Sequence, residues 1–410
     1  MSIKPAKELG EQRVAREAVV AVTKLLAAAT TLVVLLLVIL TGSLVPISVS
    51  KAAVLPKDRA DVMYHSYQGG GMSIDGPSIL IRKKMSKNIS ASFNHYVDTV
   101  SSASIDVLAT ASPYKEERSE QSLGLNYLQD NTLISVGVSQ SNENDYQAKS
   151  FNFDLSHEFF GNLTTVTMGL SKGSDEITLN GNDNFFEQAE QTNYRLGLSQ
   201  ILTKNFQMGL NLEAITNQGY LNNPYRRYRY LDDASASGYS YATEIYPNTR
   251  TSTAGAIRGR YFLPYNAAVY ASARLFSDTW GIQANNYTVG YSQSFADNWL
   301  IDVHLRYYQQ DQADFYQDMF ERKDQFNFMA RDKEMSSFND LTVGIKGRYL
   351  FKFARTSWAQ ASSVNVSLEH IKFDYDNFHN VLVTAPQGVG TEPLYQFSAN
   401  VIRFYVSLWY

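Results

Sequence analysis

The C-terminal half of the chain repeats one pattern: a segment of alternating apolar and polar residues, a tight turn, a second such segment, and a long polar loop. In residues 301–308 every second side chain is apolar and those between are polar or charged. In residues 250–260 the polar side carries Arg258 and Arg260, which need water. Because alternate side chains of a strand face opposite sides, the pattern predicts strands with one lipid face and one wet face.

These segments predict an all-β fold, a transmembrane antiparallel β-barrel. Fifteen strand segments can be counted from Ser78 onward. A further strand through residues 63–67 makes about 16, and an even number is the rule for bacterial barrels. If that segment instead plugs the lumen, the count falls to about 14. Short turns are expected to be periplasmic and long loops extracellular, the latter at residues 98–117, 173–191, 217–248, 309–334 and 375–394.

Composition supports a barrel and excludes several other classes. The mean hydropathy of -0.27 is too low for a bundle of membrane helices. The 27 Tyr and 22 Phe suit the two aromatic girdles of a barrel. A net charge of -4 argues against a nucleic-acid partner. Because the chain has no cysteine, it offers no disulfide, zinc-ribbon or haem-attachment pattern, and we expect no cofactor.

The N-terminus resembles an export signal. Basic residues from Lys4 to Lys24 precede an uncharged run from Leu25 to Val49, and small residues follow up to Ala52. This order predicts a signal peptide cleaved after Ala52. The alternative is a retained membrane helix, because the run is long enough to span a bilayer. The predicted organisation is a signal peptide at 1–52, a first strand or plug at 53–77, and the barrel at 78–410.

The last residues alternate in the same way and end on an aromatic residue. Leu408 and Tyr410 belong to a run that is apolar at every second position. The run resembles the C-terminal signal that the barrel-assembly machinery reads on outer-membrane proteins, although Tyr405 stands where a small residue is usual. An ordinary amphipathic last strand is the alternative. We predict that the assembly machinery is a partner.

Several unusual strings occur in a fixed order along the chain. They include YHSYQGGG (Tyr64 to Gly71), GYLNNPYR (Gly219 to Arg226), EIYPNTRTS (Glu244 to Ser252), RYYQQDQADFYQDMF (Arg306 to Phe320) and ARDKE (Ala330 to Glu334). In these strings the chain resembles the domain of unknown function 3570 family. The resemblance implies a Gram-negative outer-membrane barrel and supplies no activity. It also suggests a small lipoprotein or a periplasmic redox protein as a partner.

Basic residues dominate the expected inward faces of consecutive strands. Ladders of arginine in a pore favour anions, so the first hypothesis is a channel or export conduit for a small anionic solute. The alternative is that opposed charges form a salt-bridged plug and the barrel acts as a surface receptor or assembly scaffold. The predicted cationic wall consists of Arg195, Arg258, Arg260, Arg274, Arg306, Lys346 and Arg348.

The predicted loops carry a second set of candidate residues. Tyrosines and arginines interleave in residues 222–233, which suits phosphate groups or sugar faces. The plainer interpretation is that they pack the loop and contact lipopolysaccharide phosphates. For the ARDKE string we expect an ion-pair network between loops. The loop residues singled out are Tyr114, Arg118, Tyr225, Arg226, Arg250, Trp280, Asp314, Arg331 and Asp332.

Few residue patterns in the sequence suggest a metal site or a catalytic site. Asp311, Asp314 and Asp318 would share one face of a helical turn and could bind Ca²⁺, but a solvated acidic loop is the plainer interpretation, and we predict no metal site. An Asp302 and His304 pair lies on one strand face, where such positions are about 7 Å apart. No hydrolase-type serine motif accompanies it. We therefore predict that the protein is not an enzyme.

Overall fold

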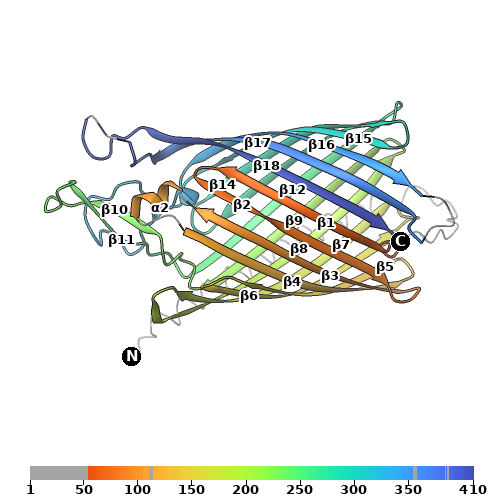
Figure 1. The fold of residues 1–410 in the computed structure, drawn as a ribbon, viewed down its shortest axis with the longest axis horizontal. Helices are drawn as coiled ribbons and strands as arrows, with labels where there is room; N and C mark the ends of the chain where they lie inside the picture. Colours follow the sequence, from red (N-terminus) through yellow and green to blue (C-terminus); the bar gives the residue numbers. More distant parts are fainter. Residues whose placement is uncertain (1–53, 103, 111–113, 354–357, 384, 386) are drawn as a thin grey trace, which may run out of the picture.

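A computed structural model describes residues 54–410 apart from 103, 111–113, 354–357, 384 and 386. The described residues form a closed antiparallel barrel of sixteen strands, as Figure 1 shows. The strand count and the all-β fold confirm the sequence prediction. The predicted signal peptide lies outside the described residues. Among the helices that are described, none is long and apolar enough to cross a membrane.

The barrel strands follow one another around the wall in chain order. The first nine are β1 Arg59–Gly69, β2 Met72–Lys84, β3 Ile89–Ser102, β4 Tyr114–Gln129, β5 Thr132–Asn142, β6 Tyr146–Phe159, β7 Thr164–Leu179, β8 Asn182–Thr203 and β9 Phe206–Gly219. The other seven are β12 Thr249–Leu263, β13 Ala267–Asp278, β14 Gln283–Phe295, β15 Trp299–Gln310, β16 Phe338–Lys352, β17 Ala361–His379 and β18 Leu394–Trp409.

The first strand closes the barrel against the last. In β1, Arg59 pairs with Trp409 of β18 on one side and with Arg82 of β2 on the other. The segment that could have been a plug is therefore part of the wall. The Tyr410 hydroxyl donates a hydrogen bond to the Arg82 carbonyl oxygen at 3.1 Å, so the last residue joins β18 to β2 across β1. Closure leaves no strand edge unpaired, as a membrane-spanning sheet requires.

The outer wall of the barrel is apolar over a band next to the short turns. On β15 the exposed residues are Trp299, Ile301, Val303, Leu305 and Tyr307, with aromatic rings at both ends of the apolar run. A closed sheet with such an exterior is stable only in lipid, and aromatic girdles mark the two membrane interfaces. The protein is an outer-membrane β-barrel.

The strands run further than the apolar alternation predicts. Residues 173–191, predicted as a long loop, continue β7 and β8 as a hairpin that turns at Asn180 and Gly181. Beyond the apolar band the outward side chains are polar, so the alternation disappears while the hydrogen-bonded ladder continues. For the same reason Tyr114, which falls in the predicted loop at 98–117, lies in β4. Arg118 and Arg250, singled out with the loop residues, lie in β4 and β12.

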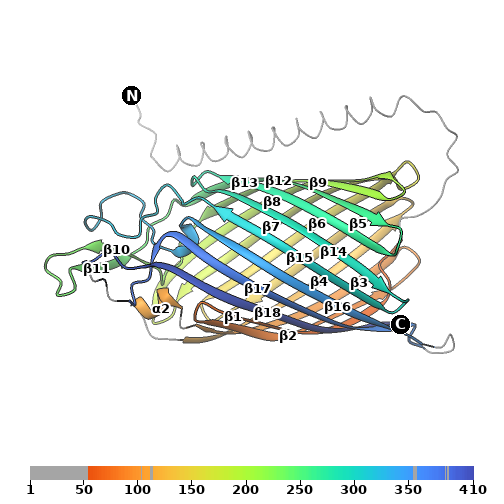
Figure 2. The same ribbon diagram turned by 90° about the horizontal axis from the view of Figure 1, so that it is seen from above.

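Four segments pack together over the other end of the barrel, which Figures 1 and 2 show on the left, opposite the short turns and the C-terminus. We call them the cap: the α2 helix Ile105–Thr110, residues 220–248 with strands β10 Arg227–Leu231 and β11 Tyr239–Thr243, residues 311–337 with the η1 turn Lys333–Met335, and residues 380–393. Backbone bridges from Tyr230 to Phe320 and from Ile245 to Met329 join two of them.

The cap has its own apolar contacts, and these place it over one half of the barrel mouth. Buried Ile105 of α2, Ala313 and Tyr316 pack against Tyr375 and Tyr395, which lie on β17 and β18. Tyr228, Phe320 and Met329 form a separate cluster within the cap. The cap is therefore a folded layer that rests on aromatic side chains of the β13 to β18 side.

Candidate functional site: the lumen and its capped mouth

The lumen wall from β8 to β16 carries the basic residues predicted for it. Ile257 on β12 and Ile345 on β16 are 49% and 48% exposed on the lipid-facing surface. Because successive side chains of a strand alternate faces, the basic residues beside them point inwards. The predicted residues are Arg195 on β8, Arg258 and Arg260 on β12, Arg274 on β13, Arg306 on β15, and Lys346 and Arg348 on β16.

Four of these basic residues face a carboxylate on another strand. These pairs lower the positive charge of the wall, although Lys346 shares its partner Glu369 with Arg403. The Arg195–Asp154 pair, whose two side chains are both partly exposed, contributes little stability, because water screens it. The pairs join Arg195 to Asp154 (2.9 Å), Arg274 to Glu213 (3.0 Å), Arg306 to Asp340 (2.9 Å) and Lys346 to Glu369 (3.9 Å).

Three of the predicted cations, Arg258, Arg260 and Arg348, make no ion pair within the described part of the chain. The guanidinium of Arg260 lies 5.4 Å from the Tyr270 ring centroid, over its face. Arg258 lies over Gly209 of the next strand, where an added Cβ would be 2.6 Å from its Nε. The small neighbour lets the arginine lie along the wall. We call these three residues the free arginines.

Three of the predicted loop residues, Arg226, Arg331 and Asp332, form ion pairs in the cap. The Arg331 backbone N–H donates a hydrogen bond to Glu244 Oε1 at 2.6 Å. The side-chain Nη2 of Arg331 lies 2.9 Å from Asp318 Oδ1. Arg226 Nε lies 3.2 Å from Asp332 Oδ2. Residues of the ARDKE string thus join the cap segments to one another.

Trp280 is buried beneath the cap, so a position in the outer aromatic girdle is excluded. Its indole N–H donates to the Thr249 carbonyl oxygen at 2.9 Å, and the Arg250 guanidinium stacks 4.6 Å from its ring centroid. Arg250 in turn pairs with Asp278 at 2.5 Å. The indole packs against Tyr246 and Ala330 of the cap, from the turn between β13 and β14.

The helical turn considered as an alternative for Asp311, Asp314 and Asp318 does not form, because residues 311–318 contain no helix. Asp318 lies in the cap between Arg331 and His379, at 2.9 and 3.0 Å. The Asp314 carboxylate instead packs against Gly281, where an added Cβ would lie 2.3 Å from Oδ1. Sequence spacing alone could not show these long-range partners.

Glu244 is the most deeply buried carboxyl group of the cap, with 1% of its surface exposed. Burial, reinforced by the nearby Asp332, raises its pKa to about 8. The Tyr246 hydroxyl and the Arg331 backbone N–H contact its two oxygens, at 2.5 and 2.6 Å. At neutral pH the group is therefore mainly protonated.

We expect Glu244→Gln to remove a pH dependence of cap docking. A glutamate in the unfolded cap loses its proton near pH 4.5, whereas Glu244 in the docked cap keeps it to about pH 8. Docking is thus strongest below about pH 4.5 and weakens as the pH rises to about 8. Glutamine mimics the protonated acid. We divide the rate at which trypsin cleaves the wild-type cap by the rate for Glu244→Gln at the same pH. This ratio should be several-fold higher at pH 9 than at pH 6.

The control for this measurement is Glu321→Gln, which makes the same change at an exposed position of the cap. It should retain the wild-type pH dependence. If the ratio of the wild-type to the Glu244→Gln cleavage rate is the same at pH 6 and pH 9, Glu244 does not make cap docking depend on pH.

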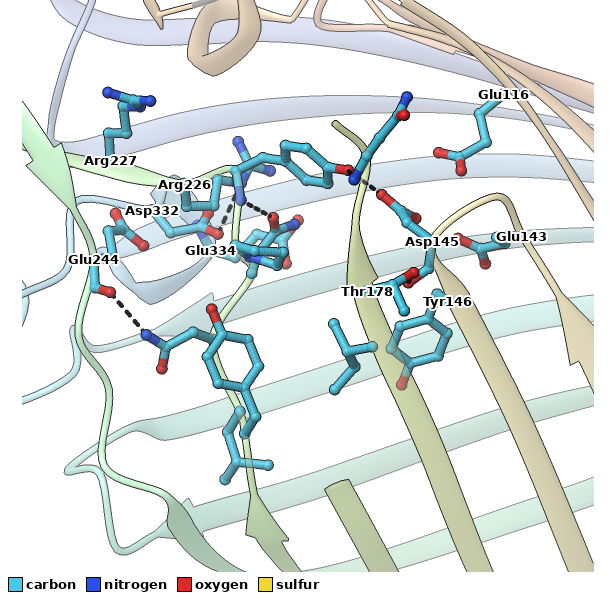
Figure 3. Close-up of a pocket in the computed structure, with 18 of the residues that line it drawn as sticks. Glu116, Glu143, Asp145, Tyr146, Thr178, Arg226, Arg227, Glu244, Asp332 and Glu334 are labelled. Carbon is cyan, nitrogen blue, oxygen red and sulfur yellow. Dashed lines mark hydrogen bonds and ion pairs between the residues drawn. The ribbon is translucent and has the colours of Figure 1, made fainter. Parts of the chain in front are cut away.

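The cap leaves an opening on its other side, towards β3 to β9. A cavity of about 810 Å³ lies there, and Figure 3 shows its lining. Three carboxylates on its wall, Glu116, Glu143 and Asp145, have oxygens within 4.8 Å of one another. Burial and the neighbouring Glu116 raise the pKa of Glu143, against the effect of Arg118. These groups are close enough to share a cation.

The sequence analysis did not find this acidic group. Its members come from the start of β4 and from the turn between β5 and β6, and only the pairing of these strands brings them together. Tyr225 of the cap reaches the same place. Its hydroxyl donates to Asp145 and accepts from the Asn180 backbone N–H at 3.1 Å, so it ties the cap to the opposite wall.

Solved structures with a similar fold are outer-membrane proteins. A bacterial polysaccharide outer-membrane secretin is 8% identical, with a TM-score of 0.48 over 86% of this chain and 98% of the other. The siderophore receptor PirA from Acinetobacter baumannii is 11% identical, with a TM-score of 0.41 over 87% of this chain and 60% of the other. The CymD monoaromatic hydrocarbon channel is 8% identical, with a TM-score of 0.41 over 87% of this chain and 89% of the other.

No curated protein sequence matches the chain significantly. One family model does match, described as "Protein of unknown function (DUF3570)", and it covers residues 23–370. This match extends beyond both ends of the stretch in which the sequence strings indicated a resemblance, and it spans most of the barrel. The chain belongs to the DUF3570 family.

Proposed function

We propose that the barrel is a diffusion channel or export conduit for small anionic solutes. The observation that carries the proposal is the set of free arginines, which point into the lumen without a carboxylate partner. Unpaired guanidinium groups in a narrow, low-dielectric passage raise the local concentration of anions and exclude cations. Of the four paired basic residues of the wall, Arg195, Arg274 and Arg306 each have a carboxylate of their own, whereas Lys346 shares Glu369 with Arg403.

A second candidate function is a surface receptor or assembly scaffold. The folded cap favours it, because Arg229 and Glu392 form a buried ion pair at 2.6 Å that keeps two cap segments in one arrangement. Tyr225 and Arg226 would then contact lipopolysaccharide or a small lipoprotein. In this case the cap would close the lumen, and a periplasmic protein would bind at the short turns.

Single-channel conductance of the refolded barrel in a planar bilayer under a salt gradient distinguishes the two candidates. Stable steps with an anion-biased reversal potential support the channel. Silence, with folding verified by heat-modifiable gel mobility, contradicts it and favours the receptor. Cation-biased steps would support a pore and contradict selection by the free arginines.

A further inference from the structure

We propose that the lumen is oppositely charged at its two ends, acidic under the cap and basic near the short turns, so that it passes ionic current better in one direction. The inference rests on the proposed channel function and extends it to the direction of flow. It follows from the acidic group at the opening, which the sequence analysis did not assign, together with the free arginines.

The acidic end lies at the opening beside the cap. Glu116 is close to the start of β4, Glu143 and Asp145 precede β6, and Asp175 lies near the end of β7. Around the whole opening, eight carboxyl groups face four basic side chains. Of these four, Arg226 and Arg331 are paired within the cap. Two further basic residues neighbour the opening, since Arg118 lies 3.7 Å from Glu143 and Lys172 lies 3.6 Å from Glu190. Even with these two counted and Glu244 protonated, the carboxylates remain in slight excess at this mouth.

The basic end lies at the opposite side of the membrane. Arg258 and Arg260 are near the end of β12 at Leu263, and Arg348 is near the end of β16 at Lys352. Both strands begin at the cap and end at the short turns, so these arginines are far from the acidic opening. The two charge groups therefore occupy separate stretches of the lumen.

Each end excludes ions of its own sign when the screening length is comparable with the pore radius. This length is about 10 Å at 0.1 M salt and about 3 Å at 1 M. A positive potential on the cap side drives cations in through the acidic end and anions in through the basic end. Both ions then accumulate in the lumen and conductance is high. The opposite potential depletes both ions, and conductance falls.

The test is the current–voltage curve of single barrels of known orientation. Because the chain has no cysteine, Ala236→Cys on the exposed β10–β11 loop provides one label on the cap side. A charged, membrane-impermeant thiol reagent added to one chamber then identifies that side. At about 0.1 M salt we expect roughly twofold more current with the cap side positive, and a ratio close to one at about 1 M.

Charge-neutral variants test the assignment of the two ends. We expect two triple variants to lower the ratio of the currents at the two polarities. The first combines Glu116→Gln, Glu143→Gln and Asp145→Asn, and the second combines Arg258→Gln, Arg260→Gln and Arg348→Gln. All six changes together should bring it close to one. Lys372→Gln, on the outward face of β17, is the control and should leave it unchanged.

The outcomes separate this inference from the proposed function. A barrel that conducts with a ratio of one at low salt, or with a ratio that the combined variant leaves unchanged, overturns the charge asymmetry alone. A folded barrel without conductance overturns both. The salt dependence is measured on the barrel with intact charges, so the inference stays testable even if a charge variant fails to fold.

Discussion

Replacing the free arginines Arg258, Arg260 and Arg348 together with glutamine will move the reversal potential of the barrel towards zero under a tenfold salt gradient. A pore that passes only anions would reach about 59 mV under this gradient, and we expect the triple variant to lose on the order of 20 mV of the measured value. The physical reason is that these side chains supply the positive charge of the wall that no carboxylate cancels. Glutamine keeps much of the side-chain volume, so pore width changes little.

The matched control changes a neutral pair in the same lumen. Arg274→Gln with Glu213→Gln removes one charge of each sign from a pair that is 3.0 Å apart. Because net charge is preserved, this double variant should retain nearly all of the anion preference. If the triple variant keeps the original reversal potential, the free arginines do not set selectivity.

Replacing Glu392 with glutamine will release a segment of the cap while the barrel stays folded. Arg229 is fully buried, and Glu392 is its ion-pair partner at 2.6 Å. Two further nitrogens of Arg229 have no hydrogen-bond acceptor among the residues that the structure describes. Removing one partner of a buried pair typically costs about 3–5 kcal/mol, because a charge is left uncompensated. Trypsin should therefore cleave the cap on the order of a hundredfold faster or more.

Two further variants separate the charge from the packing. Arg229→Leu with Glu392→Leu removes both charges, and cleavage should return towards the wild-type rate, because apolar residues often replace a buried pair without loss. Asp374→Asn breaks an exposed pair with Lys372 at 2.9 Å and should have little effect. If Glu392→Gln is digested at the wild-type rate, the ion pair does not hold the cap in place.

Several features of the wall follow from local sequence. Strand periodicity of two maps each residue directly to the lipid or the lumen, so Ile257 and Arg258 could be placed on opposite faces without knowing any partner. The positions of the short turns could be predicted for the same reason, because each turn joins two segments of alternating residues. The polar extension of β7 and β8 could not be predicted, because above the membrane both faces meet water and the alternation ends.

By itself the sequence determined the barrel and the alternation that points its arginines inwards, because these depend on local periodicity. It left the strand number at about 16 or about 14, and only the pairing of β1 with β18 and β2 decided for sixteen. The tertiary structure alone decided which arginines stay free. Arg274 meets Glu213 from 61 positions away, and Arg229 meets Glu392 from 163 positions away. The cap and the acidic opening were decided in the same way, since charge cancellation depends on distances in space, which strand register and loop packing create.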